Sequence, residues 1–307
     1  LGTSPGERTG VAAISPYAVE QIQVNVAPFD VRQGNFVGAG VNTVTRSGTN
    51  QFSGSLYRQF RNESMVGEEA KGLTFNPGTF EFTNTGGFLG GPILKNKLFF
   101  FGNADREVLK QPGTTFTANP GGAPAVGNMT RVLASDLNAL STFLNGNLQY
   151  DPGKYEGYPF KTPGNRYLAK LDYNLNSSNK LTARYIQLDS TTDVLESNSS
   201  SLGFGNRRTS TQSLNFSGSN YTILENIKSG VGEWNSTFGG SMANSLIVGF
   251  TSQDESRGAI DKLFPLVDIL NNATTYTSFG SEPFTPNNEL RYKTFQIQNN
   301  FMKFIDR

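Results

Sequence analysis

Few residues in this chain have the types and spacing that catalysis needs. Ser177 and Lys180 match Ser-x-x-Lys, an acylating pair in which the lysine activates the serine. That chemistry requires the pair to open a helix, whereas these residues lie in a tight link between expected strands and lack the partner motifs. The chain has no Cys and no His, which excludes thiol catalysis, His-based triads and most zinc sites. We therefore do not expect an enzyme.

Two further groups of residues could hold a ligand. Glu63, Glu68 and Glu69 could bind a hard cation, although a solvated loop explains them more simply. The glycine-containing stretches 38–40 and 203–208 lack the following helix that a phosphate cradle requires. We expect neither a cofactor nor a metal ion.

Composition excludes other classes of function and favours a β-rich chain. The 307 residues carry a net charge of +1 with 17% charged residues, so nothing indicates nucleic-acid binding. No stretch approaches the roughly 18 apolar residues of a membrane-spanning helix. The 34 glycines and 24 phenylalanines suit strands and turns. The chain opens at Leu1 and stops at Arg307 directly after a strand-like stretch, so we expect a fragment of a longer protein.

Eight segments in which apolar and polar residues alternate predict the main strands. Short links (ILKNK, NSSNK and GSMANS) alternate strictly with long ones. This pattern is typical of an antiparallel meander with trimmed turns at one end and elaborate loops at the other. The predicted strands are 52–60, 80–92, 98–107, 165–175, 181–189, 227–238, 246–254 and 293–304. The long loops are 61–79, 108–164, 190–226 and 255–292.

Each strand has one apolar and one polar face. In segment 165–175, Leu171 and Tyr173 share one face, while Lys170 and Asp172 share the other. A soluble β-sandwich would show the same alternation. Two observations favour a transmembrane barrel instead. The polar face suits a wet lumen, and most of the long loops far exceed the roughly 15 residues that are usual in a compact domain.

Aromatic residues near the short links support the same fold. These residues are Phe99, Phe100, Tyr173, Trp234 and Phe238. Outer-membrane barrels carry girdles of aromatic residues at their interfaces. We expect an all-β membrane fold, in which the strands form a portion of an antiparallel transmembrane β-barrel.

The link NSSNK predicts the register of the two strands that it joins. Leu175 lies opposite Leu181 if the apolar faces are to match, and this register places Asp172 opposite Arg184 on the polar face. Opposite charges directly across a ladder contribute roughly 0.2–1 kcal/mol. We expect these two residues to form a charge pair in the lumen.

Helical spacing occurs in three places. Segment 15–22 predicts a short helix with Ser15 as its N-cap. Leucines recur at helical spacing within 133–144. Segment 259–273 is expected to hold short helical turns around Pro265.

The 108–164 loop is the best candidate for ligand contact. Its amphipathic helix must bury a leucine face, so the loop is expected to fold compactly over the barrel mouth. Tyr150, Tyr155 and Tyr158 would then lie where an incoming ligand passes, and aromatic side chains give large contact area at low entropy cost. The simpler alternative is aromatic packing that only fixes the loop.

The stretch VEQIQVNVAPFDVRQGNFVGAGVNTVTRSGTNQFSGSLYRQFRN closely resembles the plug-to-barrel junction of TonB-dependent outer-membrane receptors. It is most similar to the Oar-like, OmpA-related group, near the SusC-like transporters. The shared features are Val-x-x-Ile-x-Val, FDVRQG, GVN, VTRSGTN and a Gly-Ser pair in the first barrel strand. Downstream, GGFLGGPILKNKLFFFGN, YLAKLDYNLNSSNKLTARY and FPLVDI also resemble this group, so the resemblance covers nearly the whole chain.

The resemblance implies a plug domain inside a 22-stranded barrel in the bacterial outer membrane. Residues 1–48 would be the C-terminal part of the α+β plug, and 49–307 the N-terminal portion of the barrel. About eight strands cannot close such a barrel alone. Asp30, Arg32 and Arg46 would face the polar barrel wall.

The resemblance also implies active import of a bulky nutrient, of the peptide or glycan class, which the extracellular loops and the plug capture. Outer-membrane lipid surrounds such a protein. The TonB complex would act through a segment missing from this chain, and a surface lipoprotein or accessory subunit could join it. Two alternatives stay open: a structural or adhesive surface barrel, and a small closed barrel of eight strands without transport.

Overall fold

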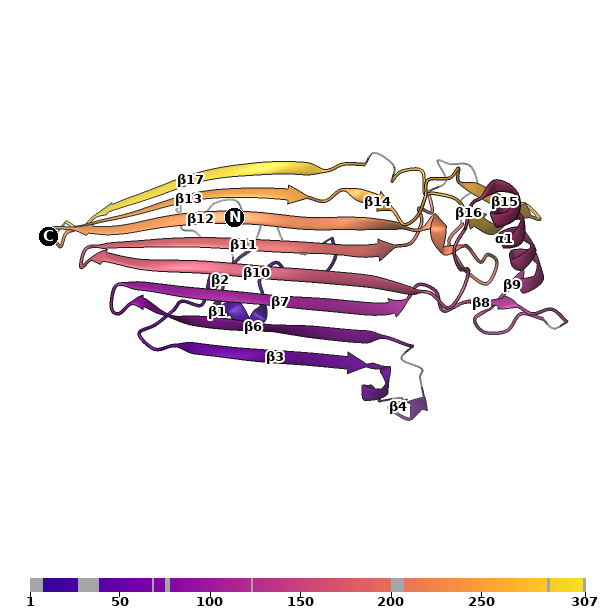
Figure 1. The fold of residues 1–307 in the computed structure, drawn as a ribbon, viewed down its shortest axis with the longest axis horizontal. Coiled ribbons are helices and arrows are strands. Elements are labelled where there is room, and N and C mark those ends of the chain that lie inside the picture. The colour runs from indigo at the N-terminus through magenta and orange to yellow at the C-terminus, as the bar shows by residue number, and fades with distance from the viewer. Residues whose placement is uncertain are drawn as a thin grey trace.

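The computed structural model describes residues 8–26, 39–67, 69–74, 78–122, 124–199, 207–285 and 288–305. One antiparallel sheet of long strands dominates it, with folded loops gathered at one end (Figure 1). The strands are β3 (Ser53–Asn62), β6 (Glu81–Leu94), β7 (Leu98–Pro112), β10 (Pro159–Asn176), β11 (Asn179–Val194), β12 (Tyr221–Phe238), β13 (Met242–Asp254) and β17 (Arg291–Lys303). A short strand, β14 (Arg257–Ala259), pairs with the start of β12.

The sheet is the predicted meander, because the strands lie in the order β17-β13-β12-β11-β10-β7-β6-β3. All eight predicted strands are confirmed. Several extend into the expected loops: β7 ends at Pro112 and β10 begins at Pro159, so the ladder continues well beyond the predicted limits. Within the described residues, β3 and β17 are the two free ends of the order, and these eight strands do not form a small closed barrel by themselves.

The two faces of the sheet differ as the alternation predicted. We call the face that residues 8–18 and 45–47 contact the inner face, and the opposite one the outer face. Large apolar side chains cover the outer face and are exposed, with Leu56 92% and Phe295 65% accessible. The inner face holds buried polar groups such as Arg166 and Asp172. This is the arrangement expected of a wall between lipid and a polar interior.

The outer apolar side chains form a band that lies in register across the sheet. On β10, exposed apolar residues run from Tyr167 to Leu175, and a tilted strand needs about 9–11 residues to cross the hydrocarbon core. Towards the loops the band ends at polar side chains: Gln187 Nε2 donates to Asp189 Oδ2 at 2.6 Å, and Lys228 lies opposite Gln187. At the short turns, one row of the band consists of Leu98, Tyr173, Leu181, Trp234 and Leu246.

The turn between β10 and β11 is tighter than the predicted register requires. Asn176 pairs with Asn179 across a two-residue turn, and an irregularity in the ladder directly precedes Asn176. Leu181 therefore lies opposite Tyr173 rather than Leu175. The predicted register is wrong by two residues, a shift that keeps every side chain on its predicted face.

Before the sheet, the chain forms η1 (Pro16–Ala18), β1 (Val19–Val26) and β2 (Ala39–Thr45). The predicted cap is present, since Ser15 Oγ accepts a hydrogen bond from Tyr17 N at 3.3 Å. The helix predicted for 15–22 is wrong beyond this single turn. From Ile22 to Val26 the chain alternates β-branched and polar residues, which favours a strand, and β1 pairs antiparallel with β2.

The long connections contain their own short elements, at the right of Figure 1 for the later loops. These are η2 (Glu63–Met65), β4 (Glu69–Ala70), β5 (Leu73–Thr74), β8 (Thr117–Asn119), β9 (Met129–Leu133), α1 (Ala134–Leu148), η4 (Ser217–Ser219), β15 (Val267–Asn271) and β16 (Thr274–Phe279). Helix α1 confirms the helix that the leucine spacing within 133–144 predicted. The helical turns predicted for 259–273 are wrong, because Val267 and Ile269 instead pair with β16. None of the helices in the described part of the chain is long and apolar enough to cross a membrane.

If the outer face contacts lipid, a charged side chain near the middle of the apolar band must lower the free energy of unfolding. We expect Phe250→Arg to destabilise the full-length protein by about 2–4 kcal/mol, the cost of an arginine at the bilayer midplane. Asn226→Arg is the control, because this outer-face site lies between Asp189 and Asp254 at the polar edge of the band. It should cost at most about 1 kcal/mol. Urea unfolding in phospholipid vesicles measures both, and equal losses would contradict the assignment of the outer face.

Candidate functional site

A buried ion cluster occupies the inner face where β7 and β10 pair. Arg166 lies directly opposite Asp105 in the ladder, and its Nε is 2.6 Å from Asp105 Oδ1. Its Nη2 is 2.9 Å from Glu107 Oε2, so the guanidinium bridges two carboxylates on one strand. The Arg166 and Asp105 side chains are 4% and 0% exposed. An arginine this buried requires such partners, because an unpaired buried charge is strongly destabilising.

Tyr57 connects this cluster to the N-terminal segment. Its hydroxyl donates to Asp105 Oδ2 at 2.8 Å and accepts from Asn103 Nδ2 at 3.3 Å. The same hydroxyl lies 3.3 Å from Ser15 Oγ. The ring of Tyr17 stacks on that of Tyr57, with centroids 3.6 Å apart. The η1 turn is therefore held against the wall by one aromatic stack and a chain of hydrogen bonds that ends at Arg166.

A second set of contacts joins the end of β2 to the wall. Lys170 Nζ donates to Thr45 O at 3.1 Å and to Ser47 Oγ at 2.9 Å. The guanidinium of Arg46 lies 4.4 Å from the centroid of the Phe88 ring on β6. The structure thus places Arg46 at the wall. Asp30 and Arg32, the other two residues expected there, lie outside the described residues.

Residues 8–13 lie along the inner face, with residue 8 nearest the long loops. Thr9 donates to Glu225 Oε2 on β12 from its backbone N at 3.0 Å and from its Oγ1 at 2.9 Å. Val11 packs against β10, where a Cβ on Gly164 would come within 2.6 Å of Val11 Cγ1. A glycine is required at this position because the N-terminal segment approaches the wall so closely.

The predicted charge pair is replaced by a different arrangement. Asp172 lies opposite Thr182, whose Oγ1 donates to Asp172 Oδ1 at 2.8 Å, and Arg184 lies opposite Lys170. The direct opposition of Asp172 and Arg184 is therefore wrong, although both residues are on the inner face. Two lysines balance the carboxylate instead: Lys180 Nζ and Lys170 Nζ are 3.5 and 3.9 Å from Asp172.

At the opposite end of the sheet, three of the long connections fold together into one compact unit, which we call the loop domain. Its elements α1, β9, β15 and β16 cluster beyond the strand ends (Figure 1). Tyr276 of β16 ties two loops together, because its hydroxyl accepts from Leu133 N and donates to Asp136, both at 2.7 Å. The buried apolar residues are Ala118, Val132, Leu137, Leu144, Tyr150, Leu214, Phe216 and Phe279.

The three tyrosines expected to contact a ligand lie in or beside this domain. Tyr150 is 3% exposed and stacks on Phe264 with centroids 4.0 Å apart, so packing accounts for it. Tyr155 is half-buried and its hydroxyl donates to Asn138 Oδ1 at 3.0 Å. Tyr158 accepts from Asn220 Nδ2 at 3.3 Å, and burial raises the pKa of its hydroxyl to about 12. Tyr155 and Tyr158 keep part of their surface accessible.

A buried polar network forms the base of the loop domain. Arg207 is 1% exposed; its Nε is 3.2 Å from Asp268 Oδ2, and its Nη1 donates to Ser197 O at 2.8 Å. Nearby, Glu196 is 2% exposed and accepts from Asn215 Nδ2 at 2.5 Å. Burial raises the pKa of the Glu196 carboxyl above its ordinary value.

Sequence reasoning missed the Arg166 cluster, although a signal for it exists. Asp105 and Glu107 share one face of their strand, and period-2 spacing puts Arg166 on the same face of its strand as Lys170 and Asp172, which is the polar face. Placing these residues together requires the β7–β10 register, which the long intervening loop leaves open. Among the described residues, no group of acidic side chains has the geometry of a metal site.

Removing the arginine from the buried cluster should leave two uncompensated carboxylates. We expect Arg166→Met to cost about 3–5 kcal/mol of stability, and Arg166→Met/Asp105→Leu to recover part of that loss. The control is Lys110→Met, which breaks the exposed ion pair between Lys110 on β7 and Glu81 on β6 and should cost at most about 1 kcal/mol. Urea unfolding in vesicles measures all three. Equal losses of unfolding free energy in Arg166→Met and Lys110→Met would show that burial does not raise the cost of removing the arginine.

The Glu196 carboxyl should make the stability of the loop domain depend on pH. Because its pKa is raised in the folded state, its stabilising contribution is fully present below the ordinary value of 4.5 and is lost as the pH rises through the raised pKa. Glu196→Gln should remove this dependence and stabilise the domain at pH 7. Hydrogen exchange of residues 207–216, corrected for intrinsic rates, measures the effect. Glu289→Gln, at an exposed site, should change nothing, and an unaltered pH profile in Glu196→Gln would contradict the assignment.

Comparison with known proteins agrees with this architecture. Residues 44–163 match the family described as outer membrane beta barrel domain. A segment is also 37% identical over 99 residues to the TonB-dependent transporter Oar of Myxococcus xanthus. That match covers 28% of this chain and 9% of the Oar protein, so the chain corresponds to a small part of that relative's length. With the apolar outer face and polar inner face described above, these matches show that the chain forms part of an antiparallel β-barrel of the bacterial outer membrane.

Proposed function

We propose that the protein is a TonB-dependent importer of a bulky nutrient of the peptide or glycan class. In this proposal residues 1–48 are the C-terminal part of a plug, and 49–307 provide the first strands of the barrel that encloses it. Short turns of outer-membrane barrels are periplasmic and long loops extracellular, so the loop domain faces the outside. The similarity to the Oar transporter supports this reading.

The observation that carries the proposal is how the N-terminal segment is held on the inner face. Its buried apolar contacts are few: Val11 and Ala13 pack on Leu188 and Ile227, and Ala18 packs on a small neighbouring group. Most other contacts are discrete hydrogen bonds. Water can replace such bonds at a modest net cost, about 0.5–1.5 kcal/mol for each neutral bond and about 1.5–3 kcal/mol for each bond to a charged group such as Glu225 or Lys170. A segment attached in this way can be displaced without opening a large apolar core, as transport through the barrel would require.

The loop domain would supply the outer ligand surface. Its fixed core, shared by three loops, positions exposed side chains at the end of the barrel wall. Of the three tyrosines, Tyr155 and Tyr158 are the better candidates for ligand contact, because Tyr150 is sequestered in the core. Aromatic contact of this kind suits both sugar rings and peptide side chains.

A structural or adhesive surface barrel is the alternative, and the compact loop domain favours it. A folded domain outside the membrane could bind another surface without any movement inside the barrel. The two functions differ in one physical requirement, since import needs the N-terminal segment to move relative to the wall and adhesion does not.

Locking the N-terminal segment to the wall separates these functions. The described chain has no natural cysteine, and a Cβ on Gly164 would lie 3.4 Å from Val11 Cβ. This is close to the separation of about 3.5–4.5 Å that a disulfide needs. We expect Val11→Cys/Gly164→Cys, when oxidised, to abolish TonB-dependent uptake of labelled oligopeptides or oligosaccharides by cells. Reduction should restore uptake.

The matched control places a disulfide within the wall. Thr162 and Thr192 face each other on β10 and β11 with Oγ1 atoms 2.7 Å apart, so Thr162→Cys/Thr192→Cys should lock only strands that never separate. Uptake by this variant should be normal. If the oxidised Val11–Gly164 variant also takes up both probes normally, or if neither probe enters in a TonB-dependent way, import by this route is excluded.

A further inference from the structure

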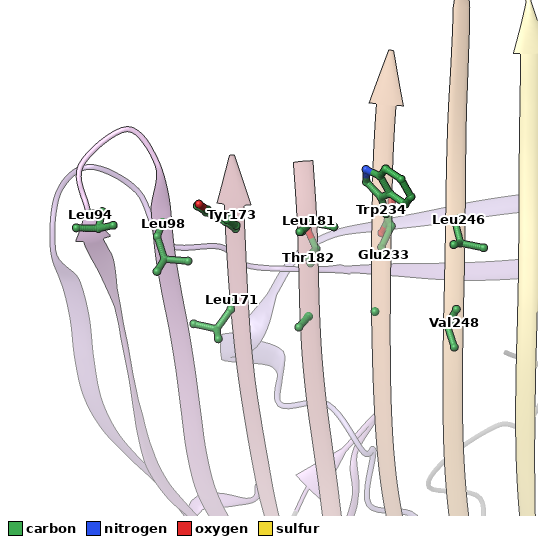
Figure 2. A pocket seen from close by; sticks show the side chains of 12 residues that line it. Leu94, Leu98, Leu171, Tyr173, Leu181, Thr182, Glu233, Trp234, Leu246 and Val248 are labelled. Atoms are coloured by element: carbon green, nitrogen blue, oxygen red, sulfur yellow. The ribbon is translucent and has the colours of Figure 1, made fainter. Parts of the chain in front are cut away.

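A groove of about 580 Å³ crosses the outer face of the barrel wall near the short turns (Figure 2). Leu171 on β10 and Val248 on β13 form its two sides, and Ala183 and Gly232 lie between them. These four residues occupy one cross-strand row, because Leu171 pairs with Ala183, Ala183 with Gly232, and Gly232 with Val248. The groove therefore arises where two small residues interrupt a row of large ones.

The floor of this groove is open space. A Cβ on Gly232 would meet no described atom within 4 Å, so nothing in the part of the chain that the structure describes requires a glycine there. Gly230, one row closer to the long loops, has the same freedom but does not line the groove. The volume lies in the range of roughly 300–1,000 Å³ that is usual for small-ligand sites, and the lining is almost entirely apolar. Its occupant must be apolar and must come from the bilayer.

Aromatic side chains border the groove at the end that faces the short turns. Figure 2 shows Tyr173 and Trp234 at this level, with Leu181 between them. Trp234 Nε1 donates to Asn179 Oδ1 at 3.0 Å, which fixes the indole. Tyrosine and tryptophan prefer the boundary between hydrocarbon and headgroups. The groove thus begins at the bilayer interface and continues into the hydrocarbon.

Beyond the aromatic residues, the turn tips form a polar depression of about 830 Å³. It adjoins the groove through Asn179, which lines the depression and accepts the hydrogen bond from Trp234, whereas Asn174 and Lys180 line it from the inner face of the sheet. Lys95 and Lys97 are exposed, and Lys97 Nζ lies 5.9 Å from the centroid of the Tyr173 ring. Among the described residues that line this depression, none is acidic. Lys180 is already paired with Asp172, so Lys95 and Lys97 give these turns the positive charge that an anion would neutralise.

We propose that this surface binds one anionic phospholipid from the periplasmic leaflet. An acyl chain would occupy the groove over Ala183 and Gly232, and the phosphate would contact Lys95 and Lys97. The order along the barrel wall, apolar then aromatic then cationic, matches the order of acyl chain, glycerol and anionic headgroup. The short turns are periplasmic in outer-membrane barrels, which places the site in the phospholipid leaflet. The proposal does not depend on the import function.

Tryptophan quenching by brominated lipids tests this site in the full-length protein. Trp234 is the single tryptophan of this chain, and the difference between wild type and Trp234→Phe isolates its emission from that of any other tryptophan. The protein would be reconstituted in phosphatidylcholine vesicles with increasing fractions of brominated phosphatidylglycerol or brominated phosphatidylcholine. We expect brominated phosphatidylglycerol to quench Trp234 at mole fractions at least about threefold lower, because the lysines favour an anionic headgroup.

Three variants locate the preference. Gly232→Leu fills the groove and should abolish the preference for brominated phosphatidylglycerol. Gly230→Leu, on the same strand and face, should retain this preference. Lys95→Gln/Lys97→Gln should also abolish it while leaving quenching by brominated phosphatidylcholine unchanged. These lysines lie on exposed turns, so this variant decides the question even if Gly232→Leu does not fold. Equal quenching by both lipids in wild type, or a preference that survives the lysine substitutions, would overturn the proposal.

Discussion

The constraint on which the rest of the structure depends is the backbone hydrogen bond in hydrocarbon. A strand in lipid must pair its polar backbone groups with neighbouring strands, because no water is present to satisfy them. The chain meets this requirement between neighbouring strands from β3 to β17, and among the described residues only the outer edges of these two strands stay unpaired. Once the ladder is fixed, each residue can face only lipid or the interior. The exposure of Leu56 and the burial of Arg166 are two consequences of the same alternation.

Features that depend on this local alternation could be predicted from the sequence, and features that depend on distant pairing could not. Period-2 patterning identified all eight strands and their faces, and leucine spacing identified α1. The opposition of Asp172 and Arg184 failed because a tight turn set the register at Asn176 and Asn179, a detail of backbone geometry that side-chain patterning does not encode. Residues 259–273 were misassigned because Val267 and Ile269 gain their strand partners from β16. The Arg166 cluster required the β7–β10 register across a long loop.

The inner face uses polar contacts where a soluble protein would use an apolar core. Arg166, Asp105 and Tyr57 form a preorganised polar surface on which Ser15 and Tyr17 rest. Within the wall Arg166 and Asp105 are buried and paired with each other, so removing either charge is destabilising. Between the wall and the N-terminal segment the contacts are mostly hydrogen bonds, with one aromatic stack, one ion pair and two small apolar clusters. This difference in strength divides the interior into a rigid part and a part that can be released.

The two ends of the strands differ in how their surroundings are filled. At the long-loop end the strands rise beyond the apolar band into water, and three loops build a shared core around Leu137, Leu144 and Phe216. Side chains from several loops fill that space, so the loop domain is complete in itself. At the short-turn end the connections are too brief to form a core, and the row through Ala183 and Gly232 leaves a gap that none of the described residues covers. Solvent cannot favourably fill an apolar gap at the level of the hydrocarbon, so lipid must. The lysines at the adjacent turn tips then determine which lipid headgroup is bound most tightly.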